Sequence, residues 1–262
     1  MGIVIAIANN KGGIGKTTIS CNLAVALSNL KKRILVVDMD SQCNATGILM
    51  PTYVNIKNSL YELLDIENKK DISISDCIYL SKYKNVYCLP NVEETAGLEL
   101  DLISEYPESL KLLKEKLEPI KDDFDIIIAD NPPNIGIFVA NSLYASDLVI
   151  VPIDASSAYS LDGLRRTFDL FHIIKEPAPI HIKILINKVD RRTQVAKAII
   201  NDLKMRFNSS EMFQTIIPVN TAIQKAEYVK QTVFHTYGSS RAARAFRELA
   251  KELISELNKL GI

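Results

Sequence analysis

A glycine-rich loop near the start of the chain constrains the fold more than any other segment. The apolar run IVIAIA at residues 3–8 predicts a buried strand, and NKGGIGKTT at residues 10–18 follows it and opens a helix predicted over residues 16–30. A strand, a glycine-rich turn and a helix in this order form a cradle for phosphate, because backbone N–H groups and the helix N-terminus concentrate partial positive charge there. The sequence therefore predicts a nucleotide-binding α/β fold.

The rest of the chain alternates short apolar runs with segments of helical length. Most of the runs are rich in β-branched residues, as in strands buried on both faces of a parallel sheet. The predicted strands are residues 3–8, 33–38, 85–90, 124–130, 147–152, 180–187 and 214–218. The clearest predicted helices are residues 16–30, 107–118, 156–175, 193–207 and 239–260. We therefore expect a doubly wound, mostly parallel twisted sheet flanked by helices, the P-loop NTPase architecture, in one domain over residues 1–262.

Composition narrows the class of protein. No apolar run reaches the roughly 18 residues that suggest a membrane span, and the four cysteines include no CxxC pair, which favours a reduced cytosolic chain. The formal net charge is +0, but residues 191–262 hold 12 Lys and Arg against 6 Asp and Glu. This local excess of positive charge is consistent with a polyanion-binding face, and also with ordinary solvated helix faces.

The position of each residue in the glycine-rich loop predicts its role. Lys16 would reach the β- and γ-phosphates of a nucleotide, the Thr17 hydroxyl would coordinate Mg²⁺, and the Thr18 hydroxyl would bond the α-phosphate. The backbone N–H groups expected to surround the phosphates belong to Gly12, Gly13, Ile14, Gly15, Lys16 and Thr17.

Three carboxylates follow predicted strands. Asp38 and Asp40 come at the end of the strand over residues 33–38, and Asp130 ends the strand over residues 124–130, at the Walker B position. Carboxylates at the C-terminal ends of parallel strands, beside a phosphate loop, hold magnesium-bound water or orient an attacking water. A single aspartate of this kind is often only a helix cap, whereas three beside a phosphate loop favour a nucleotide site.

Three motifs together resemble the ParA/MinD family of ATPases, and most closely its ParA, or Soj-like, branch. KGGIGKTT resembles the family's deviant Walker A motif, VVDMDSQCNAT its Walker A′ segment and DIIIADNPPNIG its Walker B segment. INKVDRRT and GSSRAARAFRELAKEL resemble the later segments that flank the base pocket and form the terminal helix. The resemblance extends from residue 2 to about residue 258, and it implies a weak ATPase that uses ATP and Mg²⁺.

The resemblance also implies why the loop has two lysines. Lys16 would serve the nucleotide of its own subunit, and Lys11, the signature lysine, would reach the phosphates bound to the other subunit of an ATP-dependent homodimer. Asp40 matches the family's water-activating aspartate. By the same resemblance Thr17, Asp38 and Asp130 form the magnesium set, and Asn187 and the backbone near Pro218 flank the adenine. Asn187 has a second interpretation as an ordinary polar residue at a strand end.

The function implied is DNA partition. ATP-bound dimers would bind DNA without sequence preference, and a ParB-type partner would stimulate hydrolysis and release them, in a cytoplasmic protein that associates with the nucleoid. Ala222 replaces an arginine often associated with DNA binding in the family, and Lys225 replaces an acid, so the basic patch is expected to be rearranged. The DNA-contact candidates are Arg191, Arg192, Lys197, Lys225, Lys230, Arg241, Arg244 and Arg247.

Three alternatives share parts of this chemistry. A MinD-like membrane-cycling ATPase would need a basic amphipathic tail, and the chain ends in ELNKLGI, so we expect no membrane partner. The iron protein of nitrogenase would need cysteines after DNPPNIG, and the last cysteine is Cys88. An ATPase that positions another cargo would use the same residues, and only a neighbouring ParB-like gene would distinguish it from a plasmid or chromosome partition protein.

Overall fold

The central sheet confirms the predicted fold class. The computed structural model describes residues 2–67, 72–157, 164–175 and 181–261. Within them one seven-stranded sheet has the order β3-β4-β2-β5-β1-β6-β7, and every neighbouring pair is parallel except β3 with β4. The strands are β1 Ile3–Ile7, β2 Ile34–Asp38, β3 Tyr79–Leu80, β4 Val86–Leu89, β5 Ile126–Asp130, β6 Leu148–Asp154 and β7 His181–Asn187.

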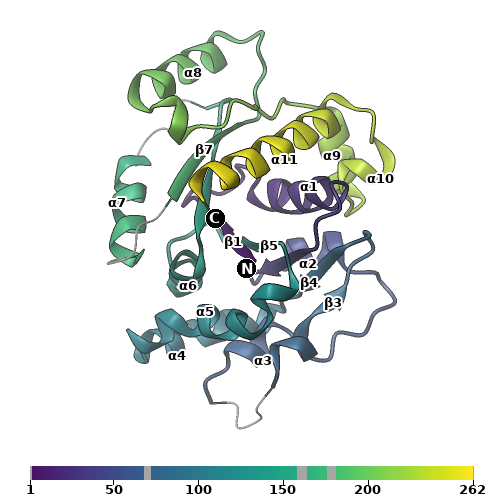
Figure 1. The fold of residues 1–262 in the computed structure, drawn as a ribbon, viewed down its shortest axis with the longest axis vertical. Helices are drawn as coiled ribbons and strands as arrows, with labels where there is room; N and C mark the ends of the chain where they lie inside the picture. Colours follow the sequence, from purple (N-terminus) through teal and green to yellow (C-terminus); the bar gives the residue numbers. More distant parts are fainter. Residues whose placement is uncertain (1, 68–71, 158–163, 176–180, 262) are drawn as a thin grey trace.

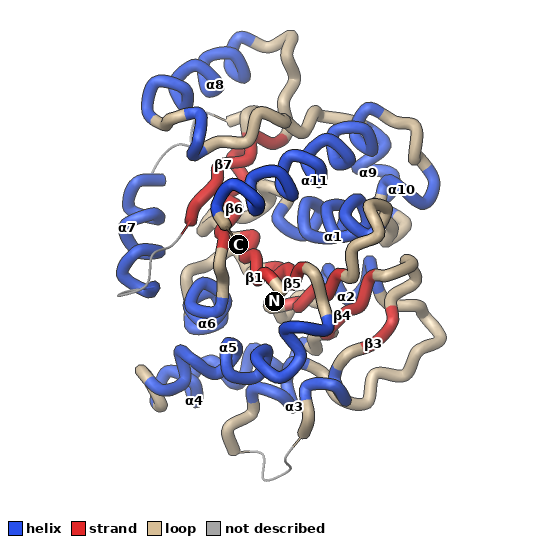
Figure 2. Tube along the Cα trace, in the orientation of Figure 1, coloured by secondary structure: helices blue, strands red, loops and turns tan. Residues whose placement is uncertain are grey.

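Helices cover both faces of this sheet (Figures 1 and 2). α1 and α11 lie on one face, and α3 to α6 lie on the other. The helices are α1 Lys16–Ser28, α2 Asn44–Leu49, α3 Leu60–Leu64, α4 Glu99–Ser104, α5 Leu112–Leu117, α6 Ile137–Ala145, α7 Leu164–Lys175, α8 Gln194–Arg206, α9 Thr221–Tyr228, α10 Val233–Thr236 and α11 Arg241–Leu260. Burial on both sides explains why strands β2, β5 and β6 are apolar almost throughout.

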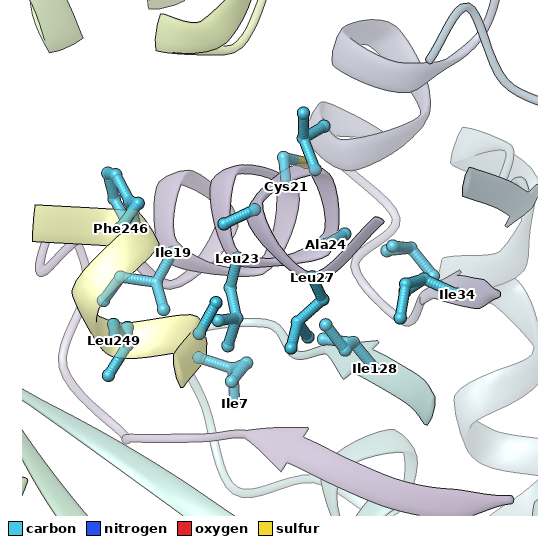
Figure 3. Packing of buried hydrophobic residues seen from close by; sticks show 14 of the residues in the cluster. Ile7, Ile19, Cys21, Leu23, Ala24, Leu27, Ile34, Ile128, Phe246 and Leu249 are labelled. Atoms are coloured by element: carbon cyan, nitrogen blue, oxygen red, sulfur yellow. The ribbon is translucent and has the colours of Figure 1, made fainter. Parts of the chain in front are cut away.

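The apolar stripe of the last helix is a packing face, as its spacing predicts. Phe246 and Leu249 of α11 lie against α1 beside Ile19 and Leu23, above Ile7 of β1 (Figure 3). Phe246 and Leu249 are both fully buried, and burying a side chain of this size contributes about 2 kcal/mol. The chain therefore ends by covering the helix that starts at the phosphate loop.

Most predicted elements agree with the structure to within two residues at either end, and three do not. Residues 214–218 do not form a strand: the backbone N–H of Ile217 donates to Ile186 of β7 at 2.9 Å, but only isolated bridges form, and Pro218 has no N–H with which to continue a ladder. The helix predicted over 107–118 begins as a 3₁₀ turn over Glu108–Lys111 and becomes α-helical only at Leu112. Of the helix predicted over 156–175, residues 164–175 are helical and residues 158–163 lie outside the described chain.

Strand register brings the functional ends of three strands together. β5 lies between β1 and β2, and Asp130 is the register partner of both Ile7 and Asp38. The glycine-rich loop leaves β1 at the same edge. The parallel topology therefore places the loop and the strand-end aspartates side by side, as the sequence predicts.

Candidate functional site

The glycine-rich loop has a backbone that only glycine adopts readily at two positions. Gly13 has φ +71° and Gly15 has φ +90°, both in the left-handed region. A Cβ on Gly15 would also lie 2.7 Å from Nδ2 of Asn187. Gly15 is the N-cap of α1, so the first backbone N–H groups of that helix have no side-chain cap and are available to an anion.

The end of β7 holds this loop from the other side. Asn187 donates from Nδ2 to the carbonyl oxygen of Ile14 at 2.7 Å, and Lys188 Nζ donates to the carbonyl of Gly13. Lys188 also pairs with Asp154 at 3.4 Å. In this arrangement Asn187, which the resemblance assigns to the base, positions the phosphate loop.

A cavity of about 580 Å³ opens beside the loop. Residues 13–18 line one side, and residues 218–220 with one face of α9 line the other. Its volume is in the range of small-molecule sites. The cavity therefore brings together the predicted phosphate residues from Gly13 to Thr18 and the predicted base residues Asn187 and Pro218, while Lys11 and Gly12 are not among the described residues that line it.

The side chain of Lys16 turns back toward the start of the loop. It is buried, and Nζ donates to the carbonyl oxygen of Lys11 at 3.1 Å. Burial lowers the pKa of Lys16, and the nearby carboxylates of Asp130 and Asp40 act in the opposite direction. A buried ammonium with one carbonyl partner can form strong hydrogen bonds to phosphate oxygens.

The two strand-end aspartates are fully buried and differ in their partners. Asp38 accepts hydrogen bonds from the backbone N–H and the hydroxyl of Thr46, both at 2.7 Å, whereas Asp130 accepts one from the Ser20 hydroxyl at 2.7 Å. Burial, together with the neighbouring Asp130, raises the pKa of Asp38 to about 7. Burial raises the pKa of Asp130 to about 6, against the hydrogen bonds from Ser20 and Thr17.

The donor set fits a magnesium ion. Oδ2 of Asp130 is buried and has no hydrogen-bond partner among the described residues, and the Thr17 hydroxyl is close enough to lower the pKa of the same carboxyl. Mg²⁺ prefers oxygen ligands and keeps several waters, which carboxylates near it can accept as hydrogen-bond donors. Asp40 is part-buried and lines the cavity. Asp38 does not line it, and its carboxylate is satisfied by Thr46, so its metal role stays a prediction.

Sequence reasoning missed several polar residues of the cavity, among them Asn131 and Glu227. Asn131 is 1% exposed, and its Nδ2 donates to the carbonyls of Ile7 and Ala129. Its position directly after Asp130 was the signal that could have found it. Glu227, near the end of α9, lines the cavity and accepts a hydrogen bond from the Thr18 hydroxyl. It belongs to no recognised motif, and only the folding of α9 over the loop brings it there.

The DNA-contact candidates are all exposed, and some already have partners. Arg192 pairs with Asp190 at 2.7 Å, and the guanidinium of Arg247 lies 5.2 Å from the centre of the Phe234 ring. Lys230 lies over α2, since a Cβ on Gly47 would be 3.8 Å from its Nζ. Lys225, Arg241 and Arg244 are in no recorded ion pair among the described residues.

These candidates lie on three parts of the molecule. α9, α10 and the N-terminal end of α11 are neighbours, which brings Lys225, Lys230 and the arginines of α11 to one region (Figure 1). Arg191 and Arg192 lie in the turn before α8, and Lys197 lies on α8 itself.

No helix of the described residues has the length and apolar character needed to cross a membrane.

Comparison with known proteins agrees with this geometry. The family model for AAA domains matches residues 2–184. The chain is 32% identical to the sporulation initiation inhibitor protein Soj of Bacillus subtilis over 256 residues, which cover 97% of this chain and 98% of the relative. It is 30% identical to the chromosome-partitioning ATPase Soj of Thermus thermophilus over 259 residues, which cover 97% and 96%.

A solved structure shares the fold over the whole chain. It is cobyrinic acid a,c-diamide synthase from Mycobacterium smegmatis with a bound ATP analogue and magnesium. The TM-score is 0.82 at 25% identity, and the match covers 100% of this chain and 98% of the other.

Proposed function

The chain belongs to the family of ParA- and Soj-like partition ATPases, and from this premise we propose that it is an ATP-dependent DNA-partitioning ATPase with ATP and Mg²⁺ as cofactors. One observation carries the proposal: α9 lines the nucleotide cavity with Ile223, Gln224 and Glu227 and also bears the exposed Lys225. A single short helix therefore touches both the nucleotide site and the basic region.

The chain's own residues have distinct parts in hydrolysis. Lys16 would hold the phosphates, and the Thr17 hydroxyl and the Asp130 carboxylate would hold Mg²⁺, which would supply positive charge to the phosphates. Asp40, which lines the cavity, orients the attacking water and accepts its proton. Lys11 serves the nucleotide of a second subunit, which its absence from the cavity lining supports. Hydrolysis is then weak until two subunits face each other and a ParB-type partner acts.

DNA is bound by the basic region of the ATP-bound homodimer. Exposed lysines and arginines on two subunits neutralise several phosphates at once, so binding ignores sequence and weakens with salt. Lys225 lies on α9, which lines the nucleotide cavity, Lys230 follows that helix, and Arg241 and Arg244 begin α11. The protein would act in the cytoplasm, on the nucleoid, to segregate a plasmid or a chromosome.

A salt titration tests this function. Binding to unrelated DNA duplexes is measured with and without ATP in the wild type and in the double variant Lys225→Glu, Arg244→Glu. We expect ATP-dependent binding with a slope of log K against log salt of roughly −0.9 per phosphate contact. In the double variant we expect a lower affinity for DNA and a shallower slope. The matched control is Lys111→Glu, Lys114→Glu, which makes the same charge change at exposed lysines in and before α5, on the other side of the sheet.

Three results would contradict the proposal. They are a strong sequence preference, binding that salt does not weaken, and binding to anionic liposomes in place of DNA. An equal loss of DNA affinity in the control variant would show a general effect of charge, and the basic region would then not be the DNA interface.

A further inference from the structure

Glu227 is an acidic side chain in a cavity built for a polyanion. One carboxylate oxygen accepts a hydrogen bond from the hydroxyl of Thr18, and both residues line the cavity. Thr18 lies in the first turn of α1, two residues after Lys16. No cation pairs with Glu227 among the described residues, so its negative charge is not neutralised by a neighbour.

A nucleotide and Glu227 compete for the same hydroxyl. Phosphate oxygens at the N-terminus of α1 bring negative charge close to the carboxylate, and like charges near a protein surface repel measurably over several ångströms. The Thr18 hydroxyl has a single proton to donate. Entry of the phosphates therefore favours separation of Glu227 from Thr18.

The segment after Glu227 is attached elsewhere. Lys82 Nζ donates to the carbonyl oxygen of Lys230 at 2.9 Å, and the backbone N–H of Thr232 donates to the Tyr83 hydroxyl at 2.8 Å. The backbone N–H of Val233 donates to Asn22 Oδ1 of α1 at 2.9 Å. These three bonds hold residues 230–233 independently of the carboxylate. Loss of the Thr18 contact would therefore release the C-terminal end of α9 from the phosphate loop, while the buried Ala222 and Ala226 and the following turn keep their places.

We propose that Glu227 is an electrostatic latch that holds α9 against the phosphate loop and opens when nucleotide phosphates enter. The latch couples nucleotide loading to the position of α9, and hence of Lys225. The consequence for DNA rests on the proposed function, whereas the latch itself requires only that the cavity takes a nucleotide.

The first test measures affinity by calorimetry for adenosine, AMP, ADP and ATP in the wild type and in Glu227→Gln. The amide keeps the size of the side chain and removes its charge. We expect ATP and ADP to bind about tenfold more tightly to the variant, AMP to gain less and adenosine to be unchanged. Glu248→Gln, an exposed acid on α11, is the matched control and should leave all four affinities unchanged.

Two outcomes of this test would overturn the latch. An unchanged ATP affinity would show that the carboxylate does not oppose the phosphates. A loss of adenosine affinity would identify Glu227 as a ligand of the sugar.

The second test measures amide hydrogen exchange in residues 221–229. ATP should accelerate exchange there in the wild type, and Glu227→Ala, which has no acceptor for the Thr18 hydroxyl, should show the faster exchange without nucleotide. Exchange that is the same in both proteins would defeat the coupling to α9. Neither test uses DNA, so failure of the latch and failure of the partition function are separate results.

Discussion

Asp38 and Asp130 stand opposite each other in register on the neighbouring parallel strands β2 and β5, and both side chains are fully buried. Burial makes both carboxylates costly to ionise: it raises the pKa of Asp38 to about 7, where the charge of Asp130 adds to the effect, and the pKa of Asp130 to about 6. A divalent cation beside them would favour the ionised forms. Binding of Mg²⁺ and the stability of the folded protein are therefore coupled at this end of the sheet.

Thr46→Val should destabilise the protein by about 1 to 3 kcal/mol. The substitution removes the hydroxyl that donates to Asp38 and that also accepts from the backbone N–H of Asn91 at 2.9 Å. Urea denaturation measures the loss. Thr52→Val, at an exposed position, is the control, and an equal effect there would mean that the buried network contributes little.

Lys16→Ala should weaken ATP binding by about 100-fold or more, because the phosphates lose their principal side-chain cation. Calorimetry gives the affinity, with Lys251→Ala on the exposed face of α11 as the control. ATP affinity within a few-fold of the wild type would show that the phosphate-loop assignment is wrong.

Asp40→Ala should separate binding from hydrolysis. The phosphate and magnesium contacts remain, so we expect an ATP-bound dimer that persists during size-exclusion chromatography while turnover falls by about 100-fold or more. A variant that stays monomeric with ATP, or one with unchanged turnover, would remove Asp40 from the role of general base.

Lys11→Ala should bind ATP with nearly wild-type affinity but should fail to form a hydrolytically competent dimer. Its side chain does not line the cavity of its own subunit, so the loss should appear only between subunits. Affinity is measured by calorimetry, and dimerisation by light scattering with ATP. Normal dimerisation together with normal stimulated hydrolysis would contradict the trans-acting role.

Glu256→Gln should lower stability by about 1 to 3 kcal/mol near neutral pH. Glu256 of α11 forms an ion pair with the buried Lys183 of β7, and this contact lowers the pKa of Glu256 below its ordinary value. A carboxylate with a lowered pKa in the folded state stabilises above its unfolded pKa of about 4.3, and this contribution is lost as the pH falls further through the folded value.

The difference in stability between the wild type and Glu256→Gln should therefore shrink below about pH 4. Urea denaturation between pH 3 and pH 7 (a range chosen to span the glutamate pKa of about 4.3) measures it. Glu248→Gln should show no such trend, because Glu248 is exposed and in no recorded ion pair among the described residues. A constant difference across this range would assign the effect to packing.

The sequence by itself determined the sheet class, the phosphate loop and the strand-end aspartates. Each of these rests on local chemistry: β-branched runs specify buried strands, a left-handed backbone at Gly13 and Gly15 requires glycine, and a strand ends where polar residues follow. Parallel topology then places such strand ends at one edge, so even the proximity of Asp38 and Asp130 followed from the pattern.

Tertiary structure alone decided which distant residues meet the loop. Asn187 reaches the loop because β7 runs parallel to β6 and β1 and ends at the same edge of the sheet, and Glu227 reaches Thr18 because α9 folds back across the cavity. The strand predicted over 214–218 fails for the same reason, since Ile217 is buried and bonded to Ile186 of β7 without a continuous ladder. These contacts depend on how elements far apart in the chain pack, and hydrophobic periodicity has no information about that.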